Sequence, residues 1–121
     1  MKLDDVVKVL EAEVIHRGRR HDENEASHVV ASDLMSDALA NAAESARLIT
    51  VLAHVNVIAV CSAVGLSAVL ICRGRPVPPD TRHAARREAV AILATARNAY
   101  RASLAVGRAF GHAADVPVPP A

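Results

Sequence analysis

The chain has 121 residues, of which 52% are hydrophobic and 22% charged, so it can bury enough apolar surface to offset chain entropy and is not disordered by default. Fourteen basic and 13 acidic residues leave a formal net charge of +1, which excludes a strong field for nucleic acid or for an anionic membrane. The length suits one domain, expected over residues 1–112, with a Pro-rich flexible tail over 113–121.

The first third of the chain alternates amphipathic and apolar segments. Residues 3–11 carry apolar side chains at helical spacing and predict a short amphipathic helix. Strands are expected at 13–16 and 28–31, separated by a polar loop that Gly18 opens. A helix is expected to follow from Ser32 onward.

Residues 48–72 contain no charged side chain and are long enough to cross a bilayer, which makes a transmembrane span one alternative. The favoured interpretation is a buried strand, a helix and a second buried strand. Asn56 is placed to cap the helix, and Gly65 is placed to end it with a positive φ. Such a unit is a parallel crossover, whose strands are apolar throughout because both faces of the sheet are covered.

After a Pro-rich loop, the sequence predicts a helix over 81–89, capped by Asp80 or Thr81, and then a strand over 90–96. A final helix over 98–112 is expected to bury Tyr100, Leu104 and Phe110. About five strands interleaved with helices predict a compact three-layer α/β/α domain with a mostly parallel sheet.

The sequence lacks the motifs of metal sites, of reactive cysteines and of secretory signals. Cys61 and Cys72 lie in apolar runs without metal-ligand spacing and are expected to be buried, reduced thiols. The six histidines are scattered, so we expect no metal site and no cofactor. The N-terminal stretch has acidic residues and no apolar core of a secretory signal, which predicts a cytoplasmic protein.

Four stretches resemble a known family: MKLDDVVKVL, ASDLMSDALA, LITVLAHVNVIAVCSAVGLSAVLICRGRPVPPD and AVAILATARNAYRASLAVGRAF. Together they look like a stand-alone DRTGG domain over nearly the whole chain, with ASDLMSD as the most specific part. The resemblance implies the fold of the N-terminal domain of HPr kinase/phosphorylase. It also implies a regulatory, dimer-forming role, since such domains accompany CBS domains or larger enzymes.

The sequence departs from the family pattern at the motif that names it. Glu25, Ala26, Ser27 and His28 stand where that motif would place Thr and glycines. A kinase of the related type needs the phosphate-binding string GxxxxGK[ST], which the chain lacks. The resemblance therefore does not imply kinase activity.

Ligands of α/β sheets bind beyond the carboxyl ends of parallel strands. Three polar segments directly follow predicted strands and are expected to lie at that edge of the sheet. The ligand-binding candidates there are Ser32, Asp33, Ser36, His54, Asn56 and Arg73. A shallow pocket of this kind suits a small anionic ligand or a nucleotide fragment, to which helix N-termini would add attraction. The alternative is structural: Ser32 and Asn56 cap helices, and the arginines lie in solvent.

No catalytic residue is assigned, because no nucleophile–base pair or oxyanion hole is evident. The favoured function is a non-catalytic regulatory or interaction module that senses a small anionic ligand or nucleotide and acts on a larger enzyme or regulatory protein. We expect it to be a homodimer, because a sheet of apolar strands flanked by short Ala-rich helices leaves an apolar face for a partner. The alternative is a small enzyme with its site at the dimer interface.

Overall fold

The computed structural model describes residues 3–18, 29–33, 47–66 and 68–109, which form five strands and four helices. In chain order these are α1 (Leu3–Leu10), β1 (Glu13–His16), β2 (Val29–Ala31), β3 (Arg47–Thr50), α3 (Val55–Val64), β4 (Ala68–Ile71), α4 (Pro79–Glu88), β5 (Ala91–Ala94) and α5 (Ala99–Ala109). All five predicted strands are present, most of them shorter than expected by a few residues. The helix expected after Ser32 and the tail over 113–121 lie outside the described residues.

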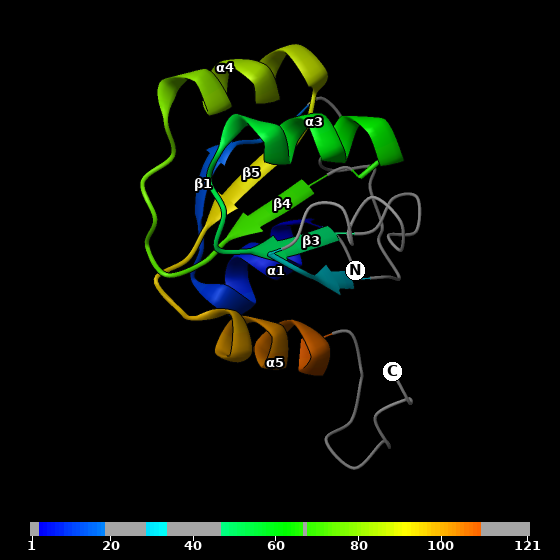
Figure 1. Cartoon of the computed structure of the whole chain (residues 1–121). Coiled ribbons are helices and arrows are strands. Elements are labelled where there is room, and N and C mark those ends of the chain that lie inside the picture. The colour runs from blue at the N-terminus through cyan, green and yellow to red at the C-terminus, as the bar shows by residue number, and fades with distance from the viewer. Residues whose placement is uncertain (1–2, 19–28, 34–46, 67, 110–121) are drawn as a thin grey trace.

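The five strands form one sheet in the order β1-β5-β4-β3-β2. Strands β2 to β5 are parallel to one another, and β1 pairs antiparallel with β5. Figure 1 shows α3 and α4 on one face of the sheet and α1 and α5 on the other. The prediction of a three-layer α/β domain with a mostly parallel sheet is confirmed.

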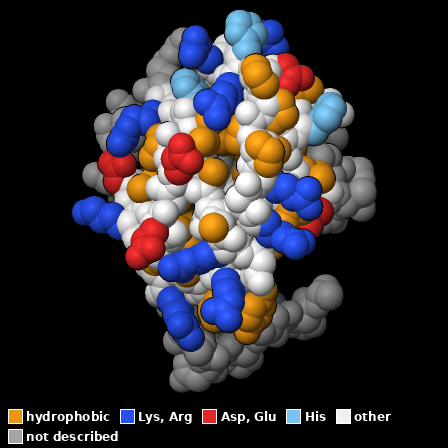
Figure 2. Space-filling model, turned by 90° about the vertical axis from the view of Figure 1, so that its left-hand side faces the viewer, with side chains coloured by type: hydrophobic (Ala, Val, Ile, Leu, Met, Phe, Trp, Pro, Cys, Tyr) orange, Lys and Arg blue, Asp and Glu red, His pale blue; other side chains and the backbone are white. Residues whose placement is uncertain are grey.

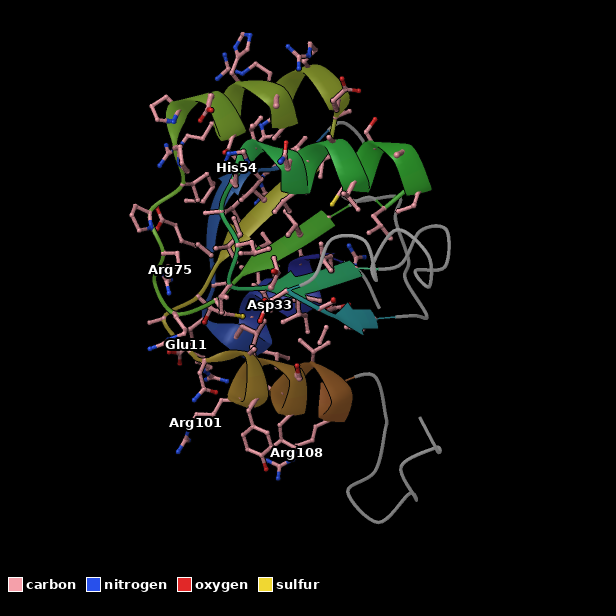
Figure 3. The ribbon with its side chains drawn as sticks, viewed as in Figure 1. Glu11, Asp33, His54, Arg75, Arg101 and Arg108 are labelled. Carbon is pink, nitrogen blue, oxygen red and sulfur yellow. The ribbon has the colours of Figure 1, made fainter. Side chains whose placement is uncertain are left out.

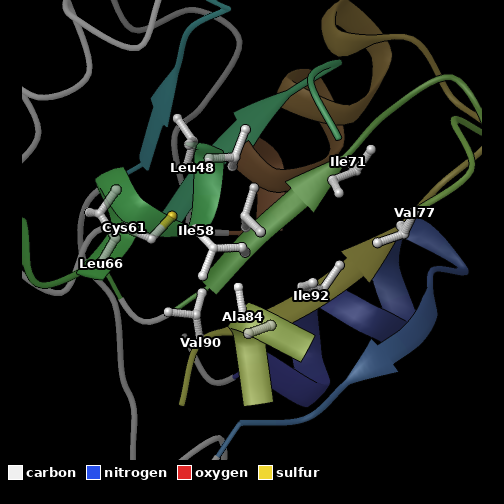
Figure 4. Packing of buried hydrophobic residues seen from close by; sticks show 12 residues of the cluster. Leu48, Ile58, Cys61, Leu66, Ile71, Val77, Ala84, Val90 and Ile92 are labelled. Carbon is white, nitrogen blue, oxygen red and sulfur yellow. The ribbon is translucent and has the colours of Figure 1, made fainter. Parts of the chain in front are cut away.

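Two apolar cores lie on opposite faces of this sheet. Leu48, Ile71 and Ile92 face α3 and α4, as the close view in Figure 4 shows. Ile49 and Leu93 belong to the second core, against α1 and α5. Successive side chains of a strand point to opposite faces, so strands covered on both sides are mostly apolar, although β3 also buries Arg47 and Thr50.

The uncharged segment 48–72 is divided between β3, α3 and β4, as the favoured interpretation predicted. All four residues of β3 and all four of β4 are buried in the sheet. Within the described part of the chain, no helix has the length and apolar character needed to cross a membrane.

The predicted cap of α3 is wrong by two residues. His54, not Asn56, is the N-cap, and its Nδ1 accepts a hydrogen bond of 3.1 Å from the backbone N–H of Asn56. A neutral imidazole nitrogen is an acceptor, so it satisfies an orphan amide as an Asn oxygen would. Gly65 ends the helix with a φ of 76°, as expected.

The start of α4 also differs from the prediction, since neither Asp80 nor Thr81 is the N-cap. The helix begins at Pro79, with Pro78 as its N-cap. Proline suits the first helical position because its fixed φ is already helical and its missing N–H would have no partner there. Thr81 is instead buried and donates a hydrogen bond of 2.8 Å to the carbonyl oxygen of Ala53.

The expected burial of Tyr100 and Leu104 in α5 is wrong. Tyr100 is 75% exposed and Leu104 is 38% exposed, whereas Ala102 and Val106 face the sheet and are buried. Small side chains on the inner face let this helix lie close to the strands, and the larger ones then point outward. Phe110 lies outside the described residues.

Candidate functional site

The carboxyl ends of β3, β4 and β5 meet at one edge of the sheet, where three backbone hydrogen bonds hold the following loops together. Cys72 N–H donates to the carbonyl oxygen of Thr50 at 2.8 Å, which joins the loop after β4 to the end of β3. Arg73 N–H donates to Arg97 at 2.8 Å, and Gly74 N–H donates to Thr95 at 2.9 Å. The loops after β4 and β5 therefore form one continuous rim.

Asp33 joins the end of β2 to the end of β3. Its Oδ1 accepts hydrogen bonds of 2.9 Å from the Thr50 hydroxyl and 2.9 Å from the Val51 N–H. The Thr50 side chain is fully buried, and its Oγ1 also accepts a 3.1 Å bond from Leu52 N–H. Sequence reasoning missed Thr50 because the residue lies inside an apolar strand.

The sequence-predicted residues that the structure describes do not form one cluster. Ser32 extends the sheet by donating its N–H to Ile49 at 3.0 Å, and Ser36 lies outside the described residues. His54 is exposed beside the start of α3, whereas Asp33 lies at the strand ends nearer α5, as Figure 3 shows. Among the described residues no hydrogen bond joins His54 to Asp33. Asn56 donates its backbone N–H to His54 and lies in the first turn of α3.

Arg73 and Gly74 form a tight turn after β4 in which both residues have positive φ, 66° and 62°. A Cβ added at Gly74 would meet no atom within 4 Å, so the turn borders open space. The exposed Arg73 side chain remains on the rim that sequence reasoning expected. The rim thus offers a guanidinium to a ligand without a bulky side chain beside it.

Both thiols are buried and reduced, as the sequence predicted. Desolvation raises the pKa of Cys61 to about 12. Desolvation, assisted by the negative charge of Asp33, raises the pKa of Cys72 to about 11. We expect neither thiol to react with a disulfide reagent in the native protein at pH 8, because only about a thousandth or less of each is thiolate there.

The reaction is followed by the absorbance of the released thiolate of the reagent, with and without denaturant. Both cysteines should react at once in the unfolded protein and only slowly in the native one. Rapid reaction of one equivalent in native buffer would contradict the burial of that thiol.

A basic pocket of about 350 Å³ lies between the loop after β5 and the outer surface of α5. Its lining is Arg97, Arg101, Leu104, Ala105 and Arg108, and we call it the α5 pocket. Asn98 orders its entrance by accepting a 2.9 Å hydrogen bond from Arg101 N–H, as a helix N-cap does. Three guanidinium groups around an apolar floor are suited to an anion that also carries an apolar part.

Sequence reasoning missed the α5 pocket. Arg101 and Arg108 are seven residues apart, which places them on one side of α5, and Arg97 precedes the helix by two residues. That spacing is a usable signal. The expectation that Tyr100 and Leu104 are buried obscured it, because it turned the wrong face of the helix toward the sheet.

A second pocket of about 350 Å³ lies at the end of β5, on the side of β1 and the loop that leads to α4. We call it the mixed-charge pocket because its lining includes two carboxylates and two guanidinium groups. These belong to Glu11, Glu13, Arg75 and Arg82. The end of β5 therefore separates a basic pocket from one that carries both signs of charge.

Comparison with known proteins identifies a family and solved structures of similar fold. The model of the DRTGG domain family matches residues 5–109. The fold is similar to a crystal structure of the CBS and DRTGG domains of the regulatory region of Clostridium perfringens pyrophosphatase, complexed with the activator diadenosine tetraphosphate. The TM-score is 0.69 at 14% sequence identity, over 89% of this chain and 46% of that chain, so the protein spans about half of its length. No curated protein sequence matches the chain.

Proposed function

The chain belongs to the DRTGG domain family, and we propose that it is a regulatory domain, without catalytic residues of its own, that binds a small anionic ligand of the nucleotide class. The observation that carries this proposal is the α5 pocket, which begins at the loop after β5 and extends over the outer surface of α5. Arg97, Arg101 and Arg108 line it, and no acidic side chain of the described residues does. Only Arg97 lies in the loop that directly follows the carboxyl end of β5, the kind of place where ligands of open α/β sheets bind.

The chemistry of the pocket suits a nucleotide better than a bare anion. Guanidinium groups bind phosphate oxygens through paired hydrogen bonds, and three of them can engage more than one phosphate. Leu104 and Ala105 supply an apolar surface on which a base can rest. In Figure 2, which views the carboxyl edge, Lys and Arg side chains gather in the lower part of this face beside a hydrophobic area.

The sequence-predicted ligand residues enter this proposal with different roles. Arg73 is tied through its backbone to Arg97, so we propose that its guanidinium contributes to the same anion site. Ser32, Asp33, His54 and Asn56 are proposed to hold the strand ends and the start of α3 in place. The described part of the chain gives Asp33 and His54 no shared hydrogen bond, which favours a binding domain over the alternative of a small enzyme.

Isothermal titration calorimetry with diadenosine tetraphosphate, ATP, AMP and adenosine tests the proposal. We expect the phosphorylated compounds to bind, more weakly as salt is added, and adenosine not to bind. The double variant Arg101→Ala, Arg108→Ala should lose about a hundredfold in affinity, since each charge-assisted contact contributes about tenfold. Arg87→Ala, on the far end of α4, is the matched control and should bind as the parent does.

Two results would overturn this function. One is the absence of heat with all three nucleotides at millimolar concentration. The other is unchanged affinity in the double variant.

We further propose that the protein is a homodimer and acts on a larger enzyme or regulatory protein. Val9 of α1 and Tyr100 of α5 are exposed large hydrophobic side chains outside the lining of the α5 pocket, and the two helices pack side by side in one layer. A second copy that covers Val9 and Tyr100 and leaves the α5 pocket open would remove this apolar surface from water. Light scattering at micromolar concentration should give twice the mass of one chain, and a mass of one chain would reject the dimer.

A further inference from the structure

We propose that the mixed-charge pocket is a second binding site, for a small zwitterion that carries an ammonium and a carboxylate group, as a free α-amino acid does. The proposal does not depend on the nucleotide site, because the two pockets share no lining residue. It follows from four charged side chains that surround one small space without neutralising one another.

The four charges come from three segments that the fold brings together. Glu11 and Glu13 flank the turn between α1 and β1, and Glu13 pairs with Ala94 at the end of β5. Arg75 belongs to the loop after β4, and Arg82 to the first half of α4. Glu11 and Arg75 lie on the same side of the molecule in Figure 3, at the carboxyl edge of the sheet.

The opposite charges of this pocket are not paired with each other. Among the described residues, no ion pair within 4.0 Å joins either glutamate to Arg75 or Arg82, although Arg17 pairs with Asp4 at 3.3 Å. Arg82 donates its Nε–H to the carbonyl oxygen of Val77 at 3.4 Å. This bond orients the guanidinium and leaves its terminal nitrogens for a carboxylate.

The rest of the lining limits the size and nature of the ligand. Ile15, Pro76 and Val77 form apolar walls, and Gly74 leaves its side of the pocket open. The volume of about 350 Å³ is at the low end of the range for small-molecule sites, roughly 300 to 1,000 Å³. A polyphosphate would meet repulsion from the two carboxylates, whereas an amino acid offers an ammonium to them and a carboxylate to the arginines.

Glu11 occupies a backbone position in which glycine is the most common residue. Its φ is 50°, and two hydrogen bonds close the end of α1 around it, from Glu11 N–H to Lys8 and from Ala12 N–H to Val7. This is the helix ending in which glycine prevails, because an L side chain is strained there. Replacing Glu11 by glycine therefore removes the carboxylate from the pocket without straining the helix end.

Glu11→Gly separates the binding role from the structural one, and Ala89→Gly is its matched control. Ala89 ends α4 with a φ of 58° and does not line the pocket, so both changes relieve the same backbone strain. Thermal unfolding is measured with each protein amino acid, and with acetate and butylamine as singly charged probes. We expect at least one amino acid to raise Tm and neither acetate nor butylamine to do so.

Calorimetry with the best amino acid should give about tenfold weaker binding for Glu11→Gly and for Arg82→Gln, and parent affinity for Ala89→Gly. Without ligand, Tm of Glu11→Gly should equal or exceed that of the parent. The proposal is rejected if no amino acid binds at millimolar concentration, if acetate or butylamine shifts Tm equally, or if Glu11→Gly binds as the parent does. Nucleotide binding should persist in Glu11→Gly, so that failure of one site is distinguished from failure of the other.

Discussion

Ile92→Ala is expected to lower the free energy of unfolding by about 3 to 4 kcal/mol, as truncation of a fully buried aliphatic side chain does. Ile92 has no exposed surface and lies in the core beneath α3 and α4. The loss combines the apolar surface returned to water with the cavity left behind. Urea denaturation followed by circular dichroism measures it, with the slope against urea expected to stay unchanged.

Leu93→Ala tests the other core, because the next residue of β5 faces α1 and α5. A similar loss is expected, and the two losses should nearly add, since the side chains share no core. The double variant would then lose about 7 kcal/mol of the roughly 5 to 15 typical of a domain, and much of it should be unfolded. Arg86→Ala, at an exposed position of α4, is the control and should cost under about 1 kcal/mol. A loss that small for Leu93→Ala would mean that α1 and α5 do not cover a true core.

The strands could be predicted from the sequence because a strand buried on both faces consists of a short, nearly continuous run of apolar residues. Runs of aliphatic residues such as 48–53 and 67–72 are typical of buried strands once a turn residue such as Gly65 divides them. The first residues of the helices were less predictable, because several kinds of residue can serve as the N-cap of a helix. His54 and Pro78 serve as N-caps where Asn56 and Asp80 or Thr81 were expected.

The sequence predicted where the candidate residues lie along the chain and in the sheet, but not which of their side chains come together. Sequence reasoning placed Asp33, His54 and Arg73 after strand ends, and they do lie there. Whether they converge depends on where each loop turns, and His54 is carried toward the α3 layer while Asp33 stays with β3. To predict the site formed by Arg101 and Arg108, one must also know which face of α5 packs on the sheet. The burial of Ala102 and Val106 determines that face.

Asp33→Ala is expected to cost about 2 kcal/mol of stability, because it removes one acceptor shared by two donors. The Thr50 hydroxyl is fully buried and would lose its acceptor, whereas water can reach the half-buried Val51. Leaving a buried donor without a partner costs roughly 1 to 3 kcal/mol. Urea denaturation of Asp33→Ala, Thr50→Val and the double variant gives the coupling between the two residues, expected at about 1 kcal/mol or more.

Asp33→Asn is the control that keeps an acceptor oxygen at nearly the same place and removes only the charge. It should recover part of the loss, because the amide oxygen can still accept from Thr50. If Asp33 holds the strand ends and does not bind ligand, the affinity for ATP should be the same in Asp33→Asn as in the parent. The opposite pattern, parent stability in Asp33→Ala with lost ATP binding, would make Asp33 a ligand residue. The carboxylate would then belong to the anion site through a cation or a protonated group of the ligand, since a bare phosphate beside Asp33 would be repelled.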